Sequence, residues 1–244
     1  MRTYGLIGYP LTHSFSEKYF TNKFHELGIN DAEYFTFSIP SIDELHLIIK
    51  THKNLRGFNI TIPYKKQVLD FLNDADVTVK AMSACNCVRI KDGQLVGYNT
   101  DVIGFEQSLM PFLKPYHNKA LILGTGGAAA AVEFVLKKLH ISYQLVSRNS
   151  TVDHLTYSDL TESIMSNHTL IINTTPVGQF PAIDQSPAIP YQLITSKHHL
   201  FDLIYNPIET SFLQKGKDMG ASTQNGYEML VLQAEESWRI WNEL

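Results

Sequence analysis

Strand-like segments alternate with helix-like segments through the first hundred residues of the chain. Three of the strand-like segments lie at residues 3–7, 34–37 and 55–60. Three segments predict helices, at residues 15–27, 42–49 and 64–72. We expect Gly28 to close the first helix, Ser41 to begin the second, and Pro63 to occupy the first position of the third.

Two further runs lie close together and predict a β-hairpin. Residues 84–90 and 94–96 flank Lys91-Asp92-Gly93, which is a turn signal. Alternating strands and helices with one hairpin favour a mostly parallel sheet with an antiparallel edge. Residues 99–101 then begin a helix that runs to about residue 113.

A boundary with two prolines, Pro111 and Pro115, separates this part from the second half of the chain. Residues 120–123 are uniformly apolar, as in a parallel strand that is buried on both faces. Residues 128–139 carry apolar positions spaced to face a sheet, which predicts a helix. Later elements are three strands and a final amphipathic helix, expected at residues 143–146, 169–172, 199–202 and 228–241.

The glycines between this apolar strand and its helix match a dinucleotide-binding pattern. Gly124, Gly126 and Ala129 fit G-x-G-x-x-G/A, in which glycines permit a tight turn and the close approach of a phosphate. Free N–H groups and the dipole of a helix N-terminus both favour an anion at this place. A glycine turn without a ligand is the alternative, but the strand before it and the helix after it favour a dinucleotide site.

The end of the next strand indicates which dinucleotide binds. NAD sites carry Asp or Glu about 20 residues past the glycines, where the carboxylate binds the ribose 2′-OH. Here Ser147-Arg148-Asn149 follows the strand, and the first acid is Asp153. Because a guanidinium holds a phosphate bidentately, we expect NADP, with Arg148 as the main determinant and Ser147 and Asn149 assisting.

Length, charge and cysteine content narrow the class of protein. The 244 residues suffice for two domains, and a net charge of -4 makes nucleic acid and anionic membranes poor partners. Cys85 and Cys87 are too few for a zinc site of their own, and we expect both to be buried, reduced thiols. The sequence has no signal-peptide core, no run of about 20 apolar residues and no metal-ligand cluster, so a cytoplasmic location is expected.

Small polar clusters follow several predicted strands of the first domain. Strand carboxyl ends line the ligand crevice of open α/β sheets, so we expect the clusters to converge on one pocket. They are Ser14 with Ser16, residues 59–65, Asn86, and residues 99–101. Neutral hydrogen-bonding side chains of this kind suit a polyhydroxylated ring.

Each cluster also has an ordinary structural interpretation. Ser14 and Ser16 suit the cap of a helix, and Asn59 and Thr61 suit hydrogen bonds within a loop. Lys65 would ordinarily be a solvated surface lysine, as we expect of Lys66. Asp101 would ordinarily lie in the first turn of a helix that Asn99 or Thr100 caps.

Seven motifs occur in the order found in one enzyme family. They are residues 8–16 (GYPLTHSFS), 59–65 (NITIPYK), 97–104 (GYNTDVIG), 124–127 (GTGG), 173–178 (NTTPVG), 202–207 (DLIYNP) and 229–234 (MLVLQA). Over nearly its whole length the chain thereby resembles the shikimate dehydrogenases. The resemblance implies the reversible, nicotinamide-dependent reduction of 3-dehydroshikimate to shikimate in aromatic amino-acid biosynthesis.

The resemblance also implies roles for individual residues. Ser14 and Ser16 hold the substrate carboxylate, and the family's Lys–Asp pair falls on Lys65 and Asp101, where it polarises the carbonyl and exchanges a proton. Hydrogen bonds to the ring hydroxyls and the reacting centre come from Asn59, Thr61, Asn86, Asp101, Tyr205 and Gln233. The cofactor positions are Gly124, Gly126, Gly127, Ala128, Ser147, Arg148, Asn149, Thr174, Leu203 and Gly226.

Three places depart from the family pattern. Cys87 stands where a threonine usually follows Asn86, and Ser211 stands where a proline commonly follows Thr210. Residues 150–167 form a short segment with no second basic residue near Arg148.

These observations predict a two-domain α/β protein. Residues 1–102, together with a helix at 226–244, are expected to form an α/β substrate-binding domain with a mostly parallel sheet. Residues 103–225 are expected to form a Rossmann-type NADP-binding domain. We expect a cleft between the two domains. A quinate dehydrogenase that uses NAD and a non-catalytic nucleotide-binding regulator are competing functions, although Lys65 and Asp101 together argue against the regulator. We expect a monomer or a homodimer whose partner is a small-molecule substrate.

Overall fold

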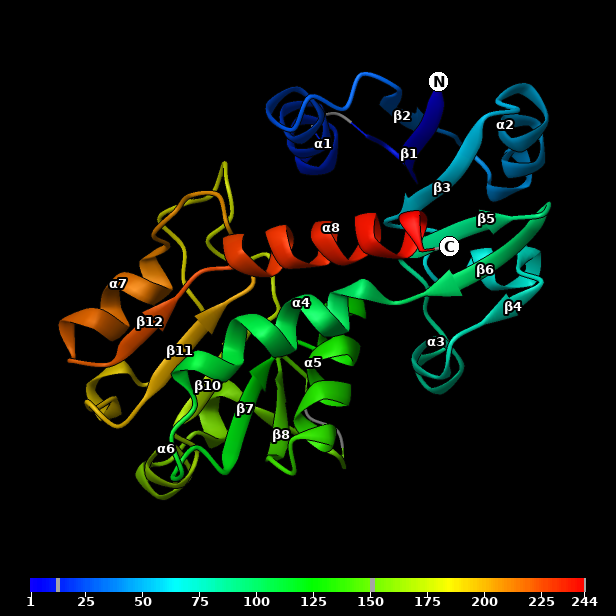
Figure 1. Cartoon of the computed structure of the whole chain (residues 1–244). Helices are drawn as coiled ribbons and strands as arrows, with labels where there is room; N and C mark the ends of the chain where they lie inside the picture. Colours follow the sequence, from blue (N-terminus) through cyan, green and yellow to red (C-terminus); the bar gives the residue numbers. More distant parts are fainter. Residues whose placement is uncertain (12–13, 150–151, 244) are drawn as a thin grey trace. The chain divides into compact units, whose positions relative to one another are not determined.

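The computed structural model describes residues 1–11, 14–149 and 152–243, and the chain folds into two compact units (Figure 1). Unit 1 comprises Met1–Ile103 and Gln233–Leu244, and unit 2 comprises Gly104–Leu232. The chain passes from one to the other within helices α4 (Thr100–Leu109) and α8 (Tyr227–Asn242). Residues 12–13 of the first motif, and residues 150–151 after Asn149, lie outside the described residues.

A six-stranded sheet forms the centre of unit 1. Its order is β2-β1-β3-β5-β6-β4, in which β1 is parallel to β2 and β3, and β5 is antiparallel to both of its neighbours. The strands are β1 (Arg2–Gly8), β2 (Ala32–Ser38), β3 (Leu55–Ile60), β4 (Asp74–Ala75), β5 (Cys87–Lys91) and β6 (Gln94–Tyr98). The helices are α1 (Phe15–Glu26), α2 (Leu45–Thr51) and α3 (Val77–Met82), with 3₁₀ helices η1 (Ile42–Glu44) and η2 (Gln67–Phe71).

The strands and the hairpin predicted for the first domain are present, but the expected antiparallel edge is wrong. Strand β5 lies inside the sheet, because β4 pairs parallel with β6 and forms the edge beyond it. Strand β4 has two residues, too few for an alternating pattern to appear in the sequence. The turn between β5 and β6 places Asp92 and Gly93 at φ 52° and 76°, as a tight hairpin turn requires.

The helix predicted at residues 64–72 is wrong in its first half. Residues 62–66 form turns, and the helical part is the 3₁₀ helix η2. In an α-helix the Lys65 carbonyl would accept from the Leu69 N–H; instead it accepts from the Cys85 N–H at 2.8 Å. The Leu69 N–H donates to the Lys66 carbonyl at 3.2 Å. The Lys65 carbonyl is therefore hydrogen-bonded to Cys85, just before β5, and does not take part in an α-helix.

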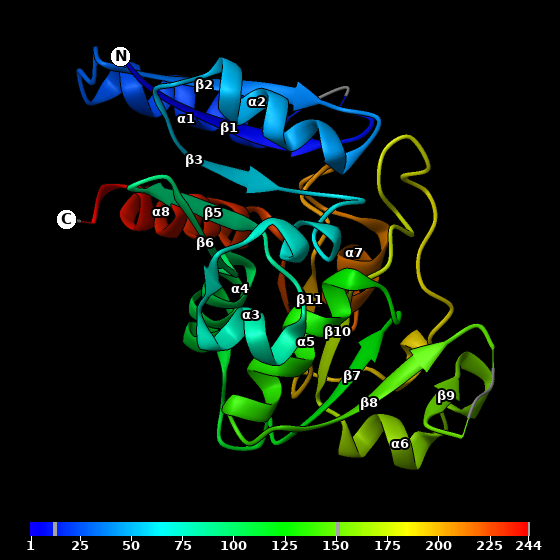
Figure 2. The same cartoon turned by 90° about the vertical axis from the view of Figure 1, so that its right-hand side faces the viewer.

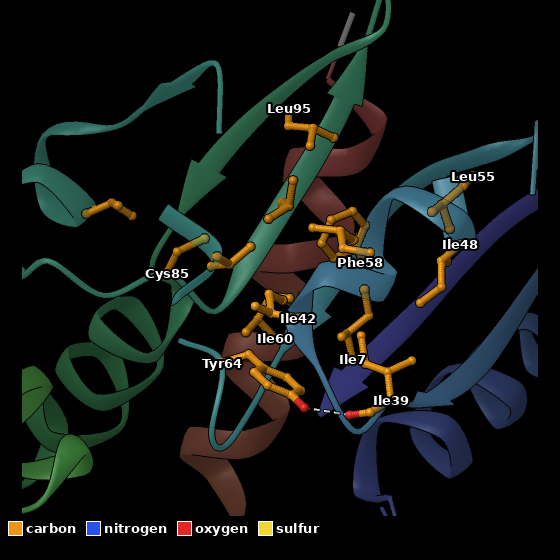
Figure 3. Close-up of a cluster of buried hydrophobic side chains, with 14 residues drawn as sticks. Ile7, Ile39, Ile42, Ile48, Leu55, Phe58, Ile60, Tyr64, Cys85 and Leu95 are labelled. Carbon is orange, nitrogen blue, oxygen red and sulfur yellow. Dashed lines mark hydrogen bonds between the residues drawn. The ribbon is translucent and has the colours of Figure 1, made fainter. Parts of the chain in front are cut away.

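Apolar side chains pack on both faces of the unit 1 sheet. On one face Phe58 of β3 belongs to the same cluster as Ile48 of α2 (Figure 3). On the other face Tyr4 of β1 packs with Phe20 of α1 and Trp241 of α8, and the rings of Tyr4 and Trp241 stack with centroids 4.9 Å apart. Helices α1 and α2 therefore cover opposite faces (Figure 2).

Unit 2 contains a second six-stranded sheet, in which every pairing is parallel. The order is β12-β11-β10-β7-β8-β9, which is the 3-2-1-4-5-6 order of the Rossmann fold when counted from β7. The strands are β7 (Lys119–Leu123), β8 (Ser142–Ser147), β9 (His154–Thr156), β10 (Leu170–Asn173), β11 (His199–Asp202) and β12 (Ser222–Gln224). The helices include α5 (Gly127–Lys138), α6 (Glu162–Asn167) and α7 (Ser211–Asp218).

The predicted strands of unit 2 are confirmed as β7, β8, β10 and β11, and the predicted helices as α5 and α8. The α-helix expected to reach residue 113 ends earlier, at Leu109. A 3₁₀ helix over Met110–Phe112 follows it directly. Pro111 explains this change, because it lacks the N–H that an α-helix would use there. The short elements β9, α6, α7 and β12 are not apparent from the sequence pattern. Among the described residues, no helix combines the length and the apolarity needed to cross a bilayer.

Candidate functional site

The site in unit 1 centres on an ion pair between Lys65 and Asp101. Lys65 Nζ lies 2.7 Å from Asp101 Oδ2, and the two side chains are 33% and 20% exposed. Lys65 follows Tyr64, which is buried and donates its hydroxyl to the Ile39 carbonyl at 2.6 Å (Figure 3). The Cys85 N–H donates a hydrogen bond to the Lys65 carbonyl. Anchored on both sides, the lysine presents its ammonium to an acid in the first turn of α4.

Asn86 holds the start of α4, directly before Asp101. Asn86 Oδ1 accepts from the Thr100 N–H at 2.6 Å, and Asn86 Nδ2 donates to Thr100 Oγ1 at 3.1 Å. The expectation that Asn99 or Thr100 caps this helix is therefore wrong. Asn99 Nδ2 donates to the Ala84 carbonyl at 2.9 Å, and its buried Oδ1 has no hydrogen-bond partner within the described part of the chain.

Asn59 is buried, and its side-chain amide is hydrogen-bonded within the protein. Asn59 Oδ1 accepts from the Tyr34 hydroxyl at 3.0 Å. Asn59 Nδ2 donates to the Asn86 carbonyl at 3.2 Å and to Ser237 Oγ at 2.9 Å. The amide thus uses both of its N–H groups and its carbonyl within unit 1. This arrangement supports the structural interpretation of Asn59 more than direct contact with a ligand.

The two serines predicted to hold a carboxylate lie at the start of α1. Ser14 Oγ caps that helix by accepting from the Glu17 N–H at 3.1 Å. Burial raises the pKa of Tyr34 well above its ordinary value, and a hydrogen bond with Ser16 partly offsets this effect. Both serines remain partly exposed. A helix N-terminus with two hydroxyls is suited to an anion.

The remaining predicted substrate residues lie in both units. Thr61 follows β3 and is partly buried, and Gln233 of α8 is buried, with its carbonyl accepting from the Ser237 hydroxyl at 2.9 Å. Tyr205 follows β11 in unit 2 and is partly exposed. The structure therefore brings Lys65, Asp101, Asn86, Asn59 and Gln233 into one connected region of unit 1.

The predicted dinucleotide turn in unit 2 connects β7 to α5. Gly124 has φ +103°, and a Cβ there would lie 2.8 Å from Thr175 Cγ2 and 2.9 Å from Thr174 Oγ1, so glycine is required. Gly126 precedes α5, and a Cβ on Gly126 or Gly127 would meet no described atom within 4 Å. The space beside these two glycines at the N-terminus of α5 is therefore open, which leaves room for an anion there.

Thr174 and Gly226 border the carboxyl ends of β10 and β11. Thr174 Oγ1 donates to the Leu123 carbonyl at 2.8 Å, which ties the end of β10 to the glycine turn. The Gly226 N–H donates to the Ile204 carbonyl at 3.0 Å. A Cβ on Gly226 would lie 2.1 Å from the Leu203 carbonyl oxygen, so a side chain does not fit there. Ala128 is exposed in the first turn of α5.

The predicted cofactor determinant Arg148 lies at the end of β8. Arg148 and Asn149 are both exposed, and the Ser147 hydroxyl donates to the Asn149 carbonyl. No acid occupies positions 147–149, in agreement with the sequence. An exposed guanidinium at the carboxyl end of the second Rossmann strand has room to bind a phosphate.

Asp202, the first residue of the motif at residues 202–207, is a buried acid. Its carboxylate accepts from Asn173 Nδ2 at 3.0 Å, from the Ile204 N–H at 3.1 Å and from Thr210 Oγ1 at 2.6 Å. Burial raises the pKa of Asp202 to about 6. The Thr210 hydroxyl also caps α7 through the Leu213 N–H. Asp202 therefore fixes the chain around Leu203, and the signal for it in the sequence was an acid at the end of a predicted strand, residues 199–202.

The described residues offer no metal site, and the two cysteines are buried. In the part of the chain that the structure describes, no three His, Cys, Asp or Glu side chains are grouped so as to hold a metal ion. Cys85 and Cys87 are free thiols and are buried, as predicted. Burial raises the pKa of the Cys85 thiol to about 12, so neither chemistry nor metal binding is indicated there.

The parallel sheet of unit 2, with a glycine turn where its strand order reverses, defines a protein of the dinucleotide-binding Rossmann class. Comparison with known proteins narrows this class. Residues 6–88 match the family model described as the shikimate dehydrogenase substrate binding domain. The chain is 37% identical to the shikimate dehydrogenase (NADP(+)) of Methanococcus vannielii, covering 97% of this chain and 90% of that protein.

A second relative and a solved structure are also shikimate dehydrogenases. The shikimate dehydrogenase (NADP(+)) of Clostridium beijerinckii is 36% identical, covering 100% of this chain and 93% of that protein. A crystal structure of a shikimate dehydrogenase in complex with NADP+ superposes with a TM-score of 0.86 at 30% identity, covering 100% and 91% of the two chains. The chain belongs to the shikimate dehydrogenase family.

Proposed function

We propose that this protein is an NADP-dependent shikimate dehydrogenase that catalyses the reversible reduction of 3-dehydroshikimate to shikimate. The observation that carries the proposal is the Lys65–Asp101 ion pair, because a proton donor held beside an acid is what carbonyl reduction by hydride requires. Relatives that share the family over nearly their whole length carry the same named activity. The enzyme would act in the shikimate pathway of aromatic amino-acid biosynthesis.

Unit 1 is the substrate-binding unit in this proposal, and unit 2 is the NADP-binding unit. The Gly124–Gly127 turn and the N-terminus of α5, with Ala128, would hold the pyrophosphate. Arg148, assisted by Ser147 and Asn149, would hold the 2′-phosphate. Thr174, Leu203 and Gly226 would border the nicotinamide. The bound nicotinamide supplies the hydride chemistry, and the protein supplies orientation and proton transfer.

Lys65 and Asp101 act on the reacting oxygen. In the reductive direction a hydride adds to the ketone carbon, the C=O π pair moves to oxygen, and that oxygen takes a proton delivered by the pair. The pair then recovers a proton from solvent, so 3-dehydroshikimate, NADPH and H⁺ yield shikimate and NADP⁺. In the oxidative direction the pair removes the hydroxyl proton as the hydride leaves. Because Lys65 Nζ and Asp101 Oδ2 lie 2.7 Å apart, both groups would be close enough to act on this proton.

The other polar side chains would orient the ring. Ser14 and Ser16, at the N-terminus of α1, suit the substrate carboxylate. Hydrogen bonds to the ring hydroxyls are assigned to Thr61, Asn86, Asp101, Tyr205 and Gln233. Because the Asn59 amide is engaged by Tyr34, Asn86 and Ser237, we assign Asn59 to the support of Asn86.

The experiment is to follow the near-ultraviolet absorbance of the reduced nicotinamide with shikimate and either NADP+ or NAD+. Formation of NADPH at a higher kcat/KM than NADH supports the proposal. Turnover of quinate with NAD+ but not of shikimate would favour the quinate enzyme. Folded protein that reduces neither cofactor would favour the non-catalytic regulator.

Location and assembly stay predictions. We propose a cytoplasmic location, supported by two free, buried thiols, which persist in reducing compartments. A monomer or a homodimer is expected, and analytical ultracentrifugation would distinguish them.

A further inference from the structure

Ser237 lies at a buried crossing of three elements of unit 1. It belongs to α8, its side chain is fully buried, and it contacts Asn59 of β3 and Thr100 of α4. Serine is a poor choice for an apolar core, because a buried hydroxyl must be hydrogen-bonded. The contacts of this hydroxyl therefore indicate why it is there.

The proton positions around Ser237 follow from its neighbours. Ser237 donates its single hydroxyl proton to the Gln233 carbonyl, one turn earlier in α8, at 2.9 Å. Its oxygen can then only accept, and it accepts from Asn59 Nδ2 at 2.9 Å. Thr100 Oγ1 lies 3.2 Å from Ser237 Oγ and 3.3 Å from Asn86 Oδ1, so both oxygens are acceptors within reach of its one hydroxyl proton. Ser237 Oγ thus accepts from Asn59 and offers the Thr100 hydroxyl an acceptor.

These two side chains lead directly to the proposed catalytic pair. Thr100 Oγ1 accepts from Asn86 Nδ2 at 3.1 Å, and the Thr100 N–H donates to Asn86 Oδ1 at 2.6 Å. The next residue is Asp101, whose carboxylate is paired with Lys65. Fixing the Thr100 hydroxyl therefore fixes the first turn of α4 and the direction in which Asp101 points.

A neighbouring thiol does not replace the serine hydroxyl. Cys87 is fully buried, and burial raises the pKa of its thiol well above the ordinary value, with an interaction with Ser237 acting in the opposite direction. A thiol is a weak acceptor, and this position is where the family usually carries threonine. The acceptor oxygen next to Asn59 and Thr100 is therefore the hydroxyl of Ser237 in α8.

We propose that Ser237 is a positioning residue that orients Asp101 through Thr100 and Asn86, and so couples the C-terminal helix to the proton-transfer pair. The inference rests on the proposed function. Ser237 touches no reacting atom, and its effect is expected in kcat for shikimate rather than in the use of NADP+. Misplacing a catalytic group by a fraction of an ångström is sufficient for a measurable loss of rate.

The test compares Ser237→Ala with Ser108→Ala. Ser108 is a matched control, since it is also a buried helical serine whose hydroxyl donates to a carbonyl of its own helix, Phe105, at 3.0 Å. We expect Ser237→Ala to lower kcat for shikimate by about tenfold, with KM for NADP+ within about twofold of wild type. Ser108→Ala should leave kcat within about twofold.

A double-mutant cycle with Asp101→Asn separates positioning from a general loss of stability. If Ser237 acts through Asp101, adding Ser237→Ala to Asp101→Asn should change kcat by less than about twofold. The full tenfold loss in that background would overturn the inference, as would wild-type kcat in Ser237→Ala alone. Wild-type protein without shikimate turnover would overturn the proposed function itself, and this role with it.

Discussion

Lys65 Nζ and Asp101 Oδ2 lie 2.7 Å apart, although 36 residues separate them in the sequence. A loop anchored by Tyr64 supplies the lysine, and the first turn of α4, held by Asn86, supplies the acid. Both ends of the pair are therefore fixed by buried hydrogen bonds, while the two side chains remain partly exposed. This preorganisation is the structural basis of the proposed proton transfer.

Replacing Lys65 by alanine is expected to lower kcat far more than substrate affinity. Loss of a positioned acid–base group typically costs about 10²–10⁴-fold in rate, and Lys65→Ala should fall in that range. Shikimate binding, which we propose is shared among Ser14, Ser16 and Gln233, should weaken much less. Steady-state kinetics and a shikimate titration measure the two effects. Lys66→Ala, at an exposed neighbouring position, is the control and should retain wild-type kcat.

Replacing Arg148 by alanine is expected to weaken the use of NADP+ selectively. A hydrogen bond to a charged group contributes about 1.5–3 kcal/mol, so kcat/KM for NADP+ should fall about 10- to 100-fold. The value for NAD+, which lacks the 2′-phosphate, should stay within about twofold and serves as the internal control. An equal loss with both dinucleotides would assign Arg148 to general binding or to folding instead.

The two glycines of the dinucleotide turn should respond differently to alanine. At Gly126 a Cβ meets no described atom, so Gly126→Ala should fold normally but raise KM for NADP+ about tenfold by occupying the space of the pyrophosphate. At Gly124 the positive φ and contacts of 2.8 and 2.9 Å should destabilise the protein by at least about 1 kcal/mol. Thermal denaturation and cofactor titration of both variants check this contrast.

His199 should make the protein less stable in mild acid. Burial beneath Phe112, together with His117, lowers the pKa of His199 from 6.5 to about 4, so the folded protein holds it neutral. The unfolded chain takes up a proton below pH 6.5, and stability is therefore lost as the pH falls from 6.5 towards 4. This single group should remove about 2 kcal/mol between pH 7 and pH 5.

The His199→Gln variant isolates this effect. Its free energy of unfolding should fall by about 2 kcal/mol less than that of wild type between pH 7 and pH 5. Asp202, whose raised pKa acts in the opposite direction, is present in both proteins and cancels. An exposed histidine, His25, provides the substitution control. Identical pH dependence in wild type and His199→Gln would contradict a neutral, buried imidazole.

Much of the fold follows from sequence because its long elements carry strong local patterns. Strand β7 is an apolar run that ends at a glycine turn, and α5 and α8 have regular apolar faces. Elements of two or three residues, such as β4 and β12, carry no periodicity and form because neighbouring strands offer them partners. The error at residues 64–72 has a similar origin, since a long-range hydrogen bond from Cys85 overrides a helical pattern.

The candidate site shows the same division between local and long-range information. The sequence brings Lys65 and Asp101 forward as a pair through the family motifs, and the structure places them in contact. It gives no means of foreseeing that Asn86 caps α4, or that Asn59 is engaged by Tyr34 and Ser237. These partners come from strands and helices far apart in the chain, and a motif does not state which side chains face each other.

Preference for shikimate over quinate is expected, because quinate carries an additional hydroxyl on the carbon that bears the carboxylate. That hydroxyl would have to be accommodated beside Ser14 and Ser16, where Ser14 Oγ already caps α1. We expect a higher kcat/KM for shikimate. Equal values for the two acids would contradict this preference without affecting the assignment of the proton-transfer pair.

The most direct test of the central claim is the initial rate of NADPH formation from shikimate and NADP+, measured by near-ultraviolet absorbance for the wild type and for Asp101→Asn. We predict shikimate-dependent formation of NADPH by the wild-type protein and a kcat lower by about 10²-fold or more in a folded Asp101→Asn variant. A wild-type protein that forms no NADPH, or an Asp101→Asn variant with unchanged kcat, would contradict the account.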